Sequence, residues 1–247
     1  MQGSETKYRI RGSILGLITI FVVWKTFSFI LKNPALPSPE LVAYVIVANS
    51  RTLLVHLISS LLRVAYSITL AFSLAFPIGI LSRENKFDRF FMPFIYLLYP
   101  IPHIVLLPIY ILIFGIGDLS KVALIATILF FQIVVTTRDA SRQISDYYIY
   151  SILSLGASKF DVYKHVVIPA SLPRILTAIR ISIGTAIAVL FFAESFATNL
   201  GLGYVILDSW GRANFGLMYA SMVLLALLGF SLYIFLEKIE KRICRWI

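Results

Sequence analysis

The chain has 247 residues, of which 59% are hydrophobic and 14% are charged. That composition excludes an ordinary soluble domain, because uncharged runs such as 90–117 and 215–236 exceed the ~20 apolar residues that a helix needs to cross a bilayer. The net charge of +10 is spread over the segments between apolar runs, which indicates membrane orientation and not a nucleic-acid partner. The sequence therefore predicts an all-α polytopic membrane protein, folded as a single transmembrane domain over residues 1–247.

Six membrane-spanning helices joined by short loops account for the apolar runs. The first run has a basic flank but no small-residue cleavage site, so residues 1–35 are predicted to remain as an anchor helix and 36–247 to form the core. A separate lead-in helix on the outer side, Val42–Leu62, is predicted before the second span. The six predicted spans are Ser13–Leu31, Val64–Ser82, Phe90–Phe114, Ser120–Thr137, Ile175–Ala193 and Phe215–Leu236.

Lysine and arginine residues set the expected orientation, because they concentrate in cytoplasmic loops. With these spans, one side of the membrane receives fifteen of them, whereas the other receives only Lys32, Arg51, Lys121 and Arg212. Both termini and the polar interlude 138–174 are therefore predicted to be cytoplasmic.

The third span contains four prolines, and two of them, Pro100 and Pro102, stand close together. An interior proline removes a backbone hydrogen bond and clashes with the preceding turn, so a kink is predicted there. Irregular backbone at membrane depth survives where it lines a wet cavity or packs in protein. Pro100, Pro102 and His103 are therefore candidates for lining a pathway through the membrane. The alternative is a tolerated kink whose freed carbonyls bond to His103.

Isolated polar groups near the bilayer are costly and usually face the interior of a helix bundle. Glu194, at the outer end of the fifth span, is a candidate for a gate or a helix-packing contact, and the alternative is a carboxylate at the membrane surface. Arg63 and Arg180 lie near span ends, so both are expected to snorkel toward water. Gln132 in the fourth span is expected to bond a neighbouring helix.

The interlude reads as two short helices. The first, 147–155, is closed by Gly156, which favours a left-handed terminator. The second begins at Ser158–Asp161, which fits the [ST]-x-x-[DE] capping box. Pro169 and Pro173 are predicted to stop this second helix and to begin the next element.

Within this interlude the motifs become recognisable, because Gly156-Ala157-Ser158, Val167-Ile168-Pro169 and Leu172-Pro173 resemble the cytoplasmic "EAA" loop of ABC-importer permeases. The resemblance runs from about Leu36 to the C-terminus and is strongest with the nitrate/sulfonate/taurine branch of the binding-protein-dependent permeases. The supporting stretches are Leu36–Pro39, Pro102–Pro108, Phe114–Lys121, Ala193–Glu194 and Gly201–Tyr204.

The resemblance implies a type I ABC importer permease fold in a bacterial or archaeal cytoplasmic membrane, surrounded by lipid. Such a permease pairs with a second permease chain, identical or different, to form the substrate pathway. Two ATPase subunits, which hold ATP and magnesium, grip the segment 145–168, and an extracytoplasmic binding protein delivers the substrate. The branch implies a small anion such as a sulfonate, nitrate or taurine. The alternative cargo is a vitamin or precursor, such as a pyrimidine precursor of thiamine or riboflavin.

One departure from the family concerns the contact with the ATPase. Where the family usually has Glu-Ala-Ala, this chain has Tyr150-Ser151-Ile152, so the usual acidic contact is absent, although Asp146 lies about one helical turn earlier. Apolar docking through Ile152, Leu155 and Ala157 needs no carboxylate. The resemblance assigns the following residues to ATPase coupling: Tyr150, Ser151, Ile152, Leu155, Gly156, Ala157, Ser158, Pro169 and Pro173.

No enzyme signature accompanies these features. The sequence has no G-x-x-x-x-G-K-[ST] phosphate loop, its three histidines have no metal-ligand spacing, and its single cysteine forms no multi-cysteine site. We therefore expect a non-catalytic subunit that binds neither a cofactor nor a metal. The rivals from other classes are a channel or ion-coupled carrier, which would want paired intramembrane carboxylates or an inverted repeat, and a membrane-embedded enzyme.

Overall fold

The computed structural model describes residues 2–246 of the chain, with side chains from Leu15 onward. Between residues 2 and 246 there is no β-strand, so the predicted all-α class is confirmed. The helices are α1 (Gln2–Leu31), α2 (Pro39–Ala48), α3 (Ser50–Leu81), α4 (Asn85–Leu98), η1 (His103–Leu106), α5 (Leu107–Phe114), α6 (Asp118–Arg142), α7 (Asp146–Ser154), α8 (Lys159–Val162), η2 (Tyr163–Val167), α9 (Ile168–Glu194), α10 (Leu202–Gly211) and α11 (Phe215–Ile243).

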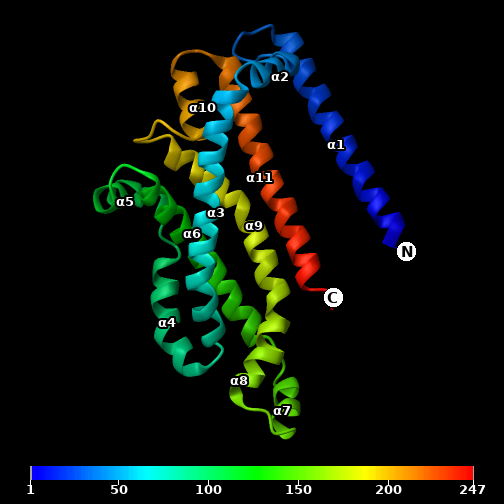
Figure 1. Cartoon of the computed structure of the whole chain (residues 1–247), viewed down its shortest axis with the longest axis vertical. Helices are drawn as coiled ribbons and strands as arrows, with labels where there is room; N and C mark the ends of the chain where they lie inside the picture. Colours follow the sequence, from blue (N-terminus) through cyan, green and yellow to red (C-terminus); the bar gives the residue numbers. More distant parts are fainter. Residues whose placement is uncertain (1, 247) are drawn as a thin grey trace.

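The long helices α3, α6, α9 and α11 run along the length of an elongated bundle (Figure 1). Helices α7 and α8 form one tip of the molecule, and α2 and α10 lie at the opposite end (Figure 1). We call residues 145–168 the coupling loop, after the role that the resemblance implies, and this tip the coupling-loop end. Helix α1 stands away from the bundle and joins it through α2 and α11: the Trp24 indole donates to the Pro37 carbonyl (3.1 Å) and stacks on Tyr219, and Lys25 pairs with Glu40.

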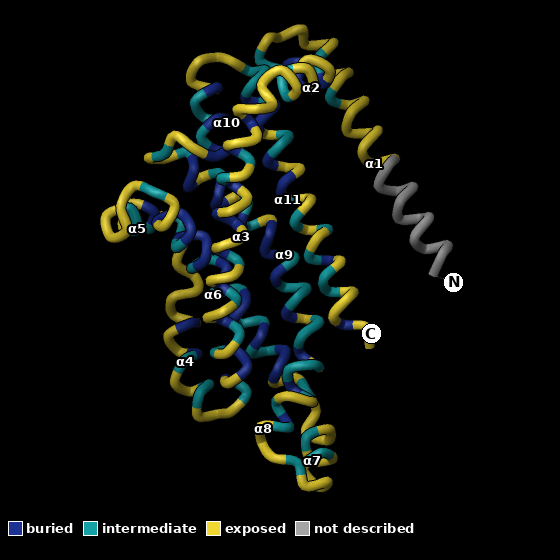
Figure 2. Tube along the Cα trace, in the orientation of Figure 1, coloured by how far each residue is buried: buried dark blue, intermediate teal, exposed yellow. Residues whose placement is uncertain are grey.

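Helix α6 is the centre of the core. Its buried face carries Leu124, Ile125 and Leu129, and it packs between α3 and α9. Small residues let α3 approach closely: a Cβ at Gly79 would lie 2.5 Å from the Thr137 Cβ. Figure 2 shows buried residues along the inner faces and exposed residues along the outer faces, and apolar side chains make up much of this exposed surface. This distribution is expected for a bundle surrounded by lipid.

Length and composition support four membrane spans: α3, α6, the continuous helix Lys159–Glu194, and α11. The bent pair of α4 with η1–α5 makes a fifth. The first predicted span, Ser13–Leu31, falls in α1, whose described apolar stretch, Leu15–Leu31, is shorter than the other spans. The helical architecture is thus as predicted, whereas the count of six is not reached by these criteria.

The predicted boundary between the lead-in helix, Val42–Leu62, and the second span, Val64–Ser82, is wrong. The helices part at Asn49, and α3 then continues unbroken from Ser50 to Leu81. The prediction placed the break near Arg63 because a charge in an apolar run indicates a span end. Arg63 is instead paired inside the bundle, so the helix continues through it.

The third predicted span breaks where its prolines cluster. Helix α4 ends at Leu98, η1 begins at His103, and the two parts are bent by 81°. Because Pro100 and Pro102 have no N–H to donate, the helical hydrogen bonds cannot continue through this turn. The predicted kink is therefore present as a full break in the helix.

The predicted stop at Pro169 and Pro173 is wrong. The chain passes from α8 through the wide π-helical turn η2 into α9, with the Ile168 N–H bonded to the Tyr163 carbonyl. Pro169 occupies the first turn of α9, where its missing N–H removes no bond of that helix, and Pro173 lies inside α9. One long helix therefore links the coupling-loop end to the opposite end of the bundle.

Candidate functional site

The coupling loop has the local structure that its sequence predicts. The Ser145 Oγ accepts the Tyr147 N–H at the start of α7, and Gly156 follows α7 at φ +85°. Ser158 and Asp161 form the predicted capping box, in which the Ser158 N–H donates to Asp161 Oδ2 (3.0 Å) and the Asp161 N–H donates to Ser158 Oγ (3.3 Å). Two short helices thus meet at a left-handed turn.

Large apolar and aromatic side chains are exposed at the tip of this loop. Tyr150 is 68% exposed, Leu155 86% and Phe160 73%, although the loop lies beyond the ends of the long helices (Figure 1). Ile152 packs partly against the core and Ala157 is half-buried, so these two are less available than predicted. Exposed apolar surface of this extent marks a site of contact with another protein or with a membrane.

Asp146, the first residue of α7, is already paired. Arg83, in the turn between α3 and α4, donates to Asp146 Oδ1 (3.1 Å) and also bonds the carbonyls of Ser141 and Ile144. The Tyr163 hydroxyl likewise donates to Glu84 Oε1 (3.3 Å) from the second arm of the loop. These bonds, which we call the brace, fix the coupling loop to the α3–α4 turn across a cavity of about 550 Å³.

A groove of about 620 Å³, with both polar and apolar groups in its walls, lies between α6 and α9 and starts at the coupling-loop end of the bundle. It adjoins a second cavity of about 430 Å³ at the helix break, and both are lined by Tyr99 and Gln132. Pro102 and His103 line that second cavity, and the His103 ring lies 4.6 Å from the Phe131 ring between centroids. Pro100 lines neither of the two. As expected, Gln132 bonds another helix, donating to Thr185 Oγ1 (3.4 Å).

Glu194 is completely buried and is the acceptor of a polar cluster at the end of α9. Ser60 Oγ lies 2.9 Å from both carboxylate oxygens, Arg63 Nη1 donates to Oε1 (2.7 Å), and the Gly203 N–H donates to Oε2 (2.9 Å). Gly201 packs so closely that a Cβ there would lie 2.2 Å from Glu194 Cδ. The carboxylate thus ties α3, α9 and α10 together.

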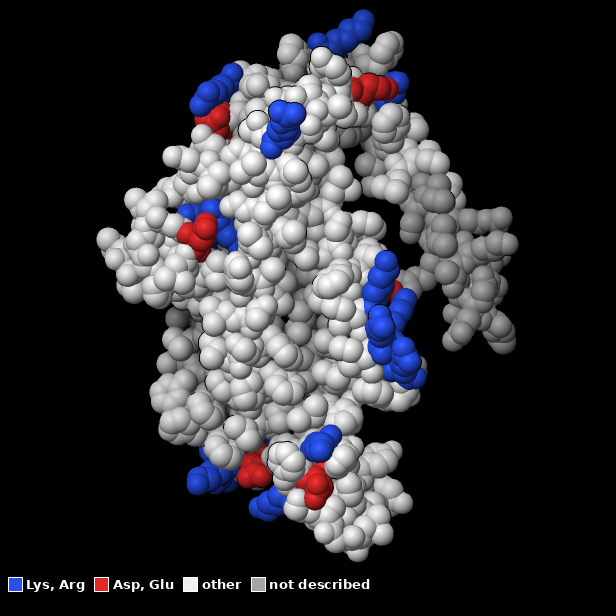
Figure 3. All heavy atoms as spheres, in the orientation of Figure 1, with Lys and Arg blue, Asp and Glu red and all other residues white. Residues whose placement is uncertain are grey.

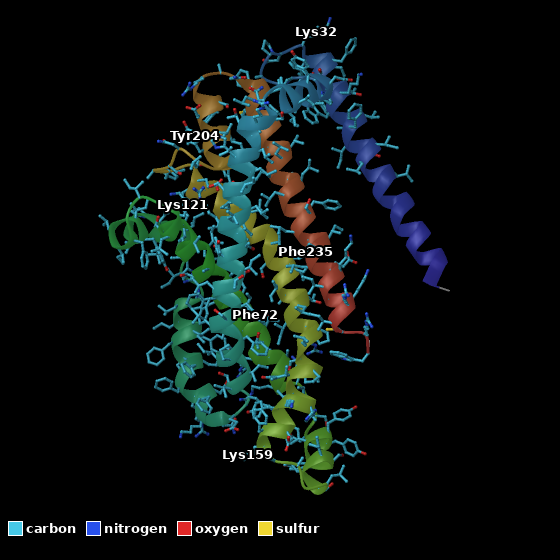
Figure 4. All side chains as sticks on the ribbon, in the orientation of Figure 1. Lys32, Phe72, Lys121, Lys159, Tyr204 and Phe235 are labelled. Carbon is cyan, nitrogen blue, oxygen red and sulfur yellow. The ribbon has the colours of Figure 1, made fainter. Side chains whose placement is uncertain are left out.

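Arg63 joins this cluster to α6. Its guanidinium also pairs with Asp118 (2.6 Å) and donates to the Leu200 carbonyl (2.8 Å), and the residue is only 3% exposed. Nearby, Lys121 is 1% exposed, and its Nζ donates to the Gly117 carbonyl (2.9 Å); Figure 4 labels it near the start of α6. The expectation that Arg63 snorkels toward water is wrong, because its partners lie inside the protein. Lys121 lies in the first turn of α6, at the start of the predicted fourth span, and is buried there.

Sequence reasoning found Glu194 but missed its partners. The available signal was two opposite charges, Arg63 and Glu194, each alone in an apolar run, since such charges pair inside membrane proteins. The predicted snorkelling of Arg180 is also wrong: it is half-buried against Glu240 (3.4 Å) and the Tyr233 ring. Among the described residues, no group of three His, Cys, Asp or Glu side chains is placed to hold a metal ion.

The sequence of this chain matches known proteins. A family model described as "binding-protein-dependent transport system inner membrane component" matches residues 67–245. The chain belongs to this family. It is therefore the permease subunit of an ATP-driven ABC importer, located in the membrane, as the resemblance implied.

Similar proteins share most of its length. The taurine transport permease TauC of Escherichia coli is 28% identical over 95% of this chain and 88% of its own. A Bacillus subtilis permease named for aliphatic sulfonates is 28% identical over 96% and 87%, and the formylaminopyrimidine transport permease ThiX of Halalkalibacterium halodurans is 27% identical over 98% of both. The taurine and sulfonate relatives confirm the branch.

Solved structures agree on the fold. The inward-facing methionine ABC transporter MetNI matches 77% of this chain and 95% of its own, with a TM-score of 0.67 and 20% sequence identity. The type I importer permease fold is therefore confirmed.

Proposed function

We propose that this permease imports a small sulfonate of the taurine or alkanesulfonate kind. The observation that carries the proposal is the set of relatives, since the taurine and aliphatic sulfonate permeases align with this chain almost from end to end. The test is uptake of labelled taurine and ethanesulfonate by liposomes that contain the complete importer with its binding protein. ATP-dependent uptake of either sulfonate supports the proposal, and uptake of neither contradicts it.

A second cargo class has a specific observation in its favour. The formylaminopyrimidine permease aligns over 98% of both chains, which is a more complete overlap than that of the sulfonate relatives. The same liposomes offered labelled formylaminopyrimidine distinguish the two, because a binding-protein-dependent importer selects its cargo before the membrane step.

We propose that the coupling loop and both termini are cytoplasmic. The charge distribution supports this orientation, since lysines and arginines gather at the coupling-loop end and at the end of α11 (Figure 3). The α10 end then faces outward, where the binding protein docks. A second permease chain, identical or different, completes the pathway, and lipid covers the remaining apolar surface.

We propose that the tip of the coupling loop docks into an ATPase subunit, which binds ATP and magnesium and carries out the hydrolysis. The exposed Tyr150, Leu155 and Phe160 support apolar docking, and the Arg83–Asp146 pair supports a contact that does without the usual glutamate. The brace then transmits the movement of the loop to α3 and α4.

A Leu155→Asp variant tests this docking, because a charge in an apolar interface costs its full desolvation. The variant is expected to lose its ATPase subunits during purification of the complex. The matched control is Lys238→Asp, a change at an exposed position near the end of α11 and outside the segment 145–168. Retention of the ATPase by Leu155→Asp contradicts the proposed docking surface.

We propose that the break beside Pro102 and His103 borders the substrate pathway, because these two residues line a cavity that shares Tyr99 and Gln132 with the α6–α9 groove. Glu194 is a helix-packing contact in this account and not a gate, since all its bonds join helices of one chain.

A further inference from the structure

The groove between α6 and α9 differs from the rest of the bundle surface in its chemistry. Most exposed positions on the long helices are apolar, whereas this groove carries polar side chains at helical spacing on both walls. These side chains are Gln132 and Thr136 on α6, Gln143 directly after α6, and Thr177, Ser182 and Thr185 on α9. At ~1.5 Å per residue, the stripe from Gln132 to Gln143 runs about 16 Å along the bundle.

Polar side chains at membrane depth face protein or water, because exposing them to lipid costs free energy. Several hydroxyls of the groove already bond within it: Thr136 Oγ1 donates to the Gln132 carbonyl (2.9 Å), and Thr185 Oγ1 accepts from the Gln132 amide. The groove nevertheless stays open, with room for about 620 Å³. An open groove that carries polar side chains on both walls, and that shares Tyr99 and Gln132 with the cavity at the helix break, offers a wet route for a polar solute.

The charges of the groove are balanced and lie at one end. Asp139 and Arg174 line it near the coupling-loop end; Asp139 is paired with Arg138 (2.7 Å), and Arg174 donates to the Gln143 side chain. Deeper along the described lining there are only hydroxyls, amides and apolar groups. Such walls solvate dipoles through hydrogen bonds, but they hold no countercharge for a net anion, which is expensive to move out of water.

We propose that the α6–α9 groove is a weak substrate-binding site on the transport route, and that it favours small zwitterions over net anions of the same size. This inference rests on the proposed function and narrows it: an amino sulfonate, which carries its own ammonium, fits the groove better than an alkanesulfonate. Thr185 and Thr136 lie at the deep part of the site, and Arg174 and Asp139 lie at its mouth.

The experiment measures thiol labelling in the intact complex of permease and ATPase, without nucleotide and without the binding protein. Its background is Cys244→Ser, which removes the only cysteine of the chain. Thr185→Cys and Thr136→Cys place a thiol in the groove. The matched control is Thr69→Cys, an exposed threonine within the α3 span and outside the groove. The reagent is iodoacetamide, which reacts with the thiolate and therefore with thiols in contact with water.

The groove thiols are expected to react at least about tenfold faster than the thiol at position 69, because only hydrated thiols ionise readily. Taurine at twice its dissociation constant is expected to slow the groove labelling about threefold, as one-site occupancy requires. Ethanesulfonate, which lacks the ammonium, is expected to slow it less at the same concentration.

Equal labelling rates at positions 185, 136 and 69 would overturn the groove as a wet route. Equal or stronger protection by ethanesulfonate would overturn the preference for zwitterions. If labelling and taurine protection are as expected while the complete importer takes up no sulfonate, the binding site in the groove is supported and the proposed sulfonate cargo is contradicted. The two ideas therefore fail separately.

Discussion

Replacing Glu194 by alanine tests the polar cluster at the end of α9. The change leaves Ser60, Arg63 and the Gly203 N–H without their shared acceptor inside a region where these groups have almost no contact with solvent. Removing one partner of a buried ion pair costs about 3–5 kcal/mol. Arg63 keeps Asp118 as a second partner, so the lower half of that range is expected.

The assay is thermal unfolding of the purified complex in detergent. For a chain of this length, ~1 kcal/mol lowers Tm by about 2–4 °C, so Glu194→Ala is expected to melt at least about 6 °C below the parent. The control is the double variant Arg63→Met with Glu194→Leu, which removes both charges and is expected to recover part of the loss. A Tm for Glu194→Ala equal to that of the parent would refute the structural role of the cluster.

Three further substitutions test other parts of the structure. Gly201→Ala is expected to lower Tm because its Cβ would collide with Glu194 at a φ of +113°, whereas Gly211→Ala, which has open space, should change Tm by less than half as much; equal effects would contradict the close packing. Gly156→Ala, at φ +85° with no neighbour in reach, should cost only about 1 kcal/mol of backbone strain, and a larger loss of Tm would mean that the turn is packed more tightly. Arg83→Ala should lower transport per ATP hydrolysed by loosening the brace, and an unchanged ratio would show that the brace does not couple.

Local signals in the sequence were sufficient where a few neighbouring residues determine the conformation. The capping box at Ser158–Asp161 and the left-handed Gly156 depend on contacts within one or two turns, and both are present as predicted. The break near Pro102 is likewise local, because proline lacks the donor that a helix needs.

The sequence was insufficient where the outcome depends on distant partners. Arg63 and Glu194 are 131 positions apart, so nothing near Arg63 indicated that it is paired inside the bundle and that α3 continues through it. The effect of Pro169 depends on its position in the helix, which the sequence does not show. A proline is tolerated in the first turn of a helix, and the π-helical turn before α9 places Pro169 there. The polar stripes of α6 and α9 form a groove only once the two helices pack together.

ATP-driven uptake by the complete importer tests whether this permease is coupled to its ATPase through the coupling loop. The permease and its ATPase are placed in liposomes. Labelled taurine and the binding protein are supplied on the α10 side of the membrane, and ATP is supplied on the side of the coupling loop. We expect accumulation that requires ATP and the binding protein and that is abolished by Leu155→Asp but not by Lys238→Asp. Accumulation that persists without ATP, or that survives Leu155→Asp, would contradict a permease coupled through this loop.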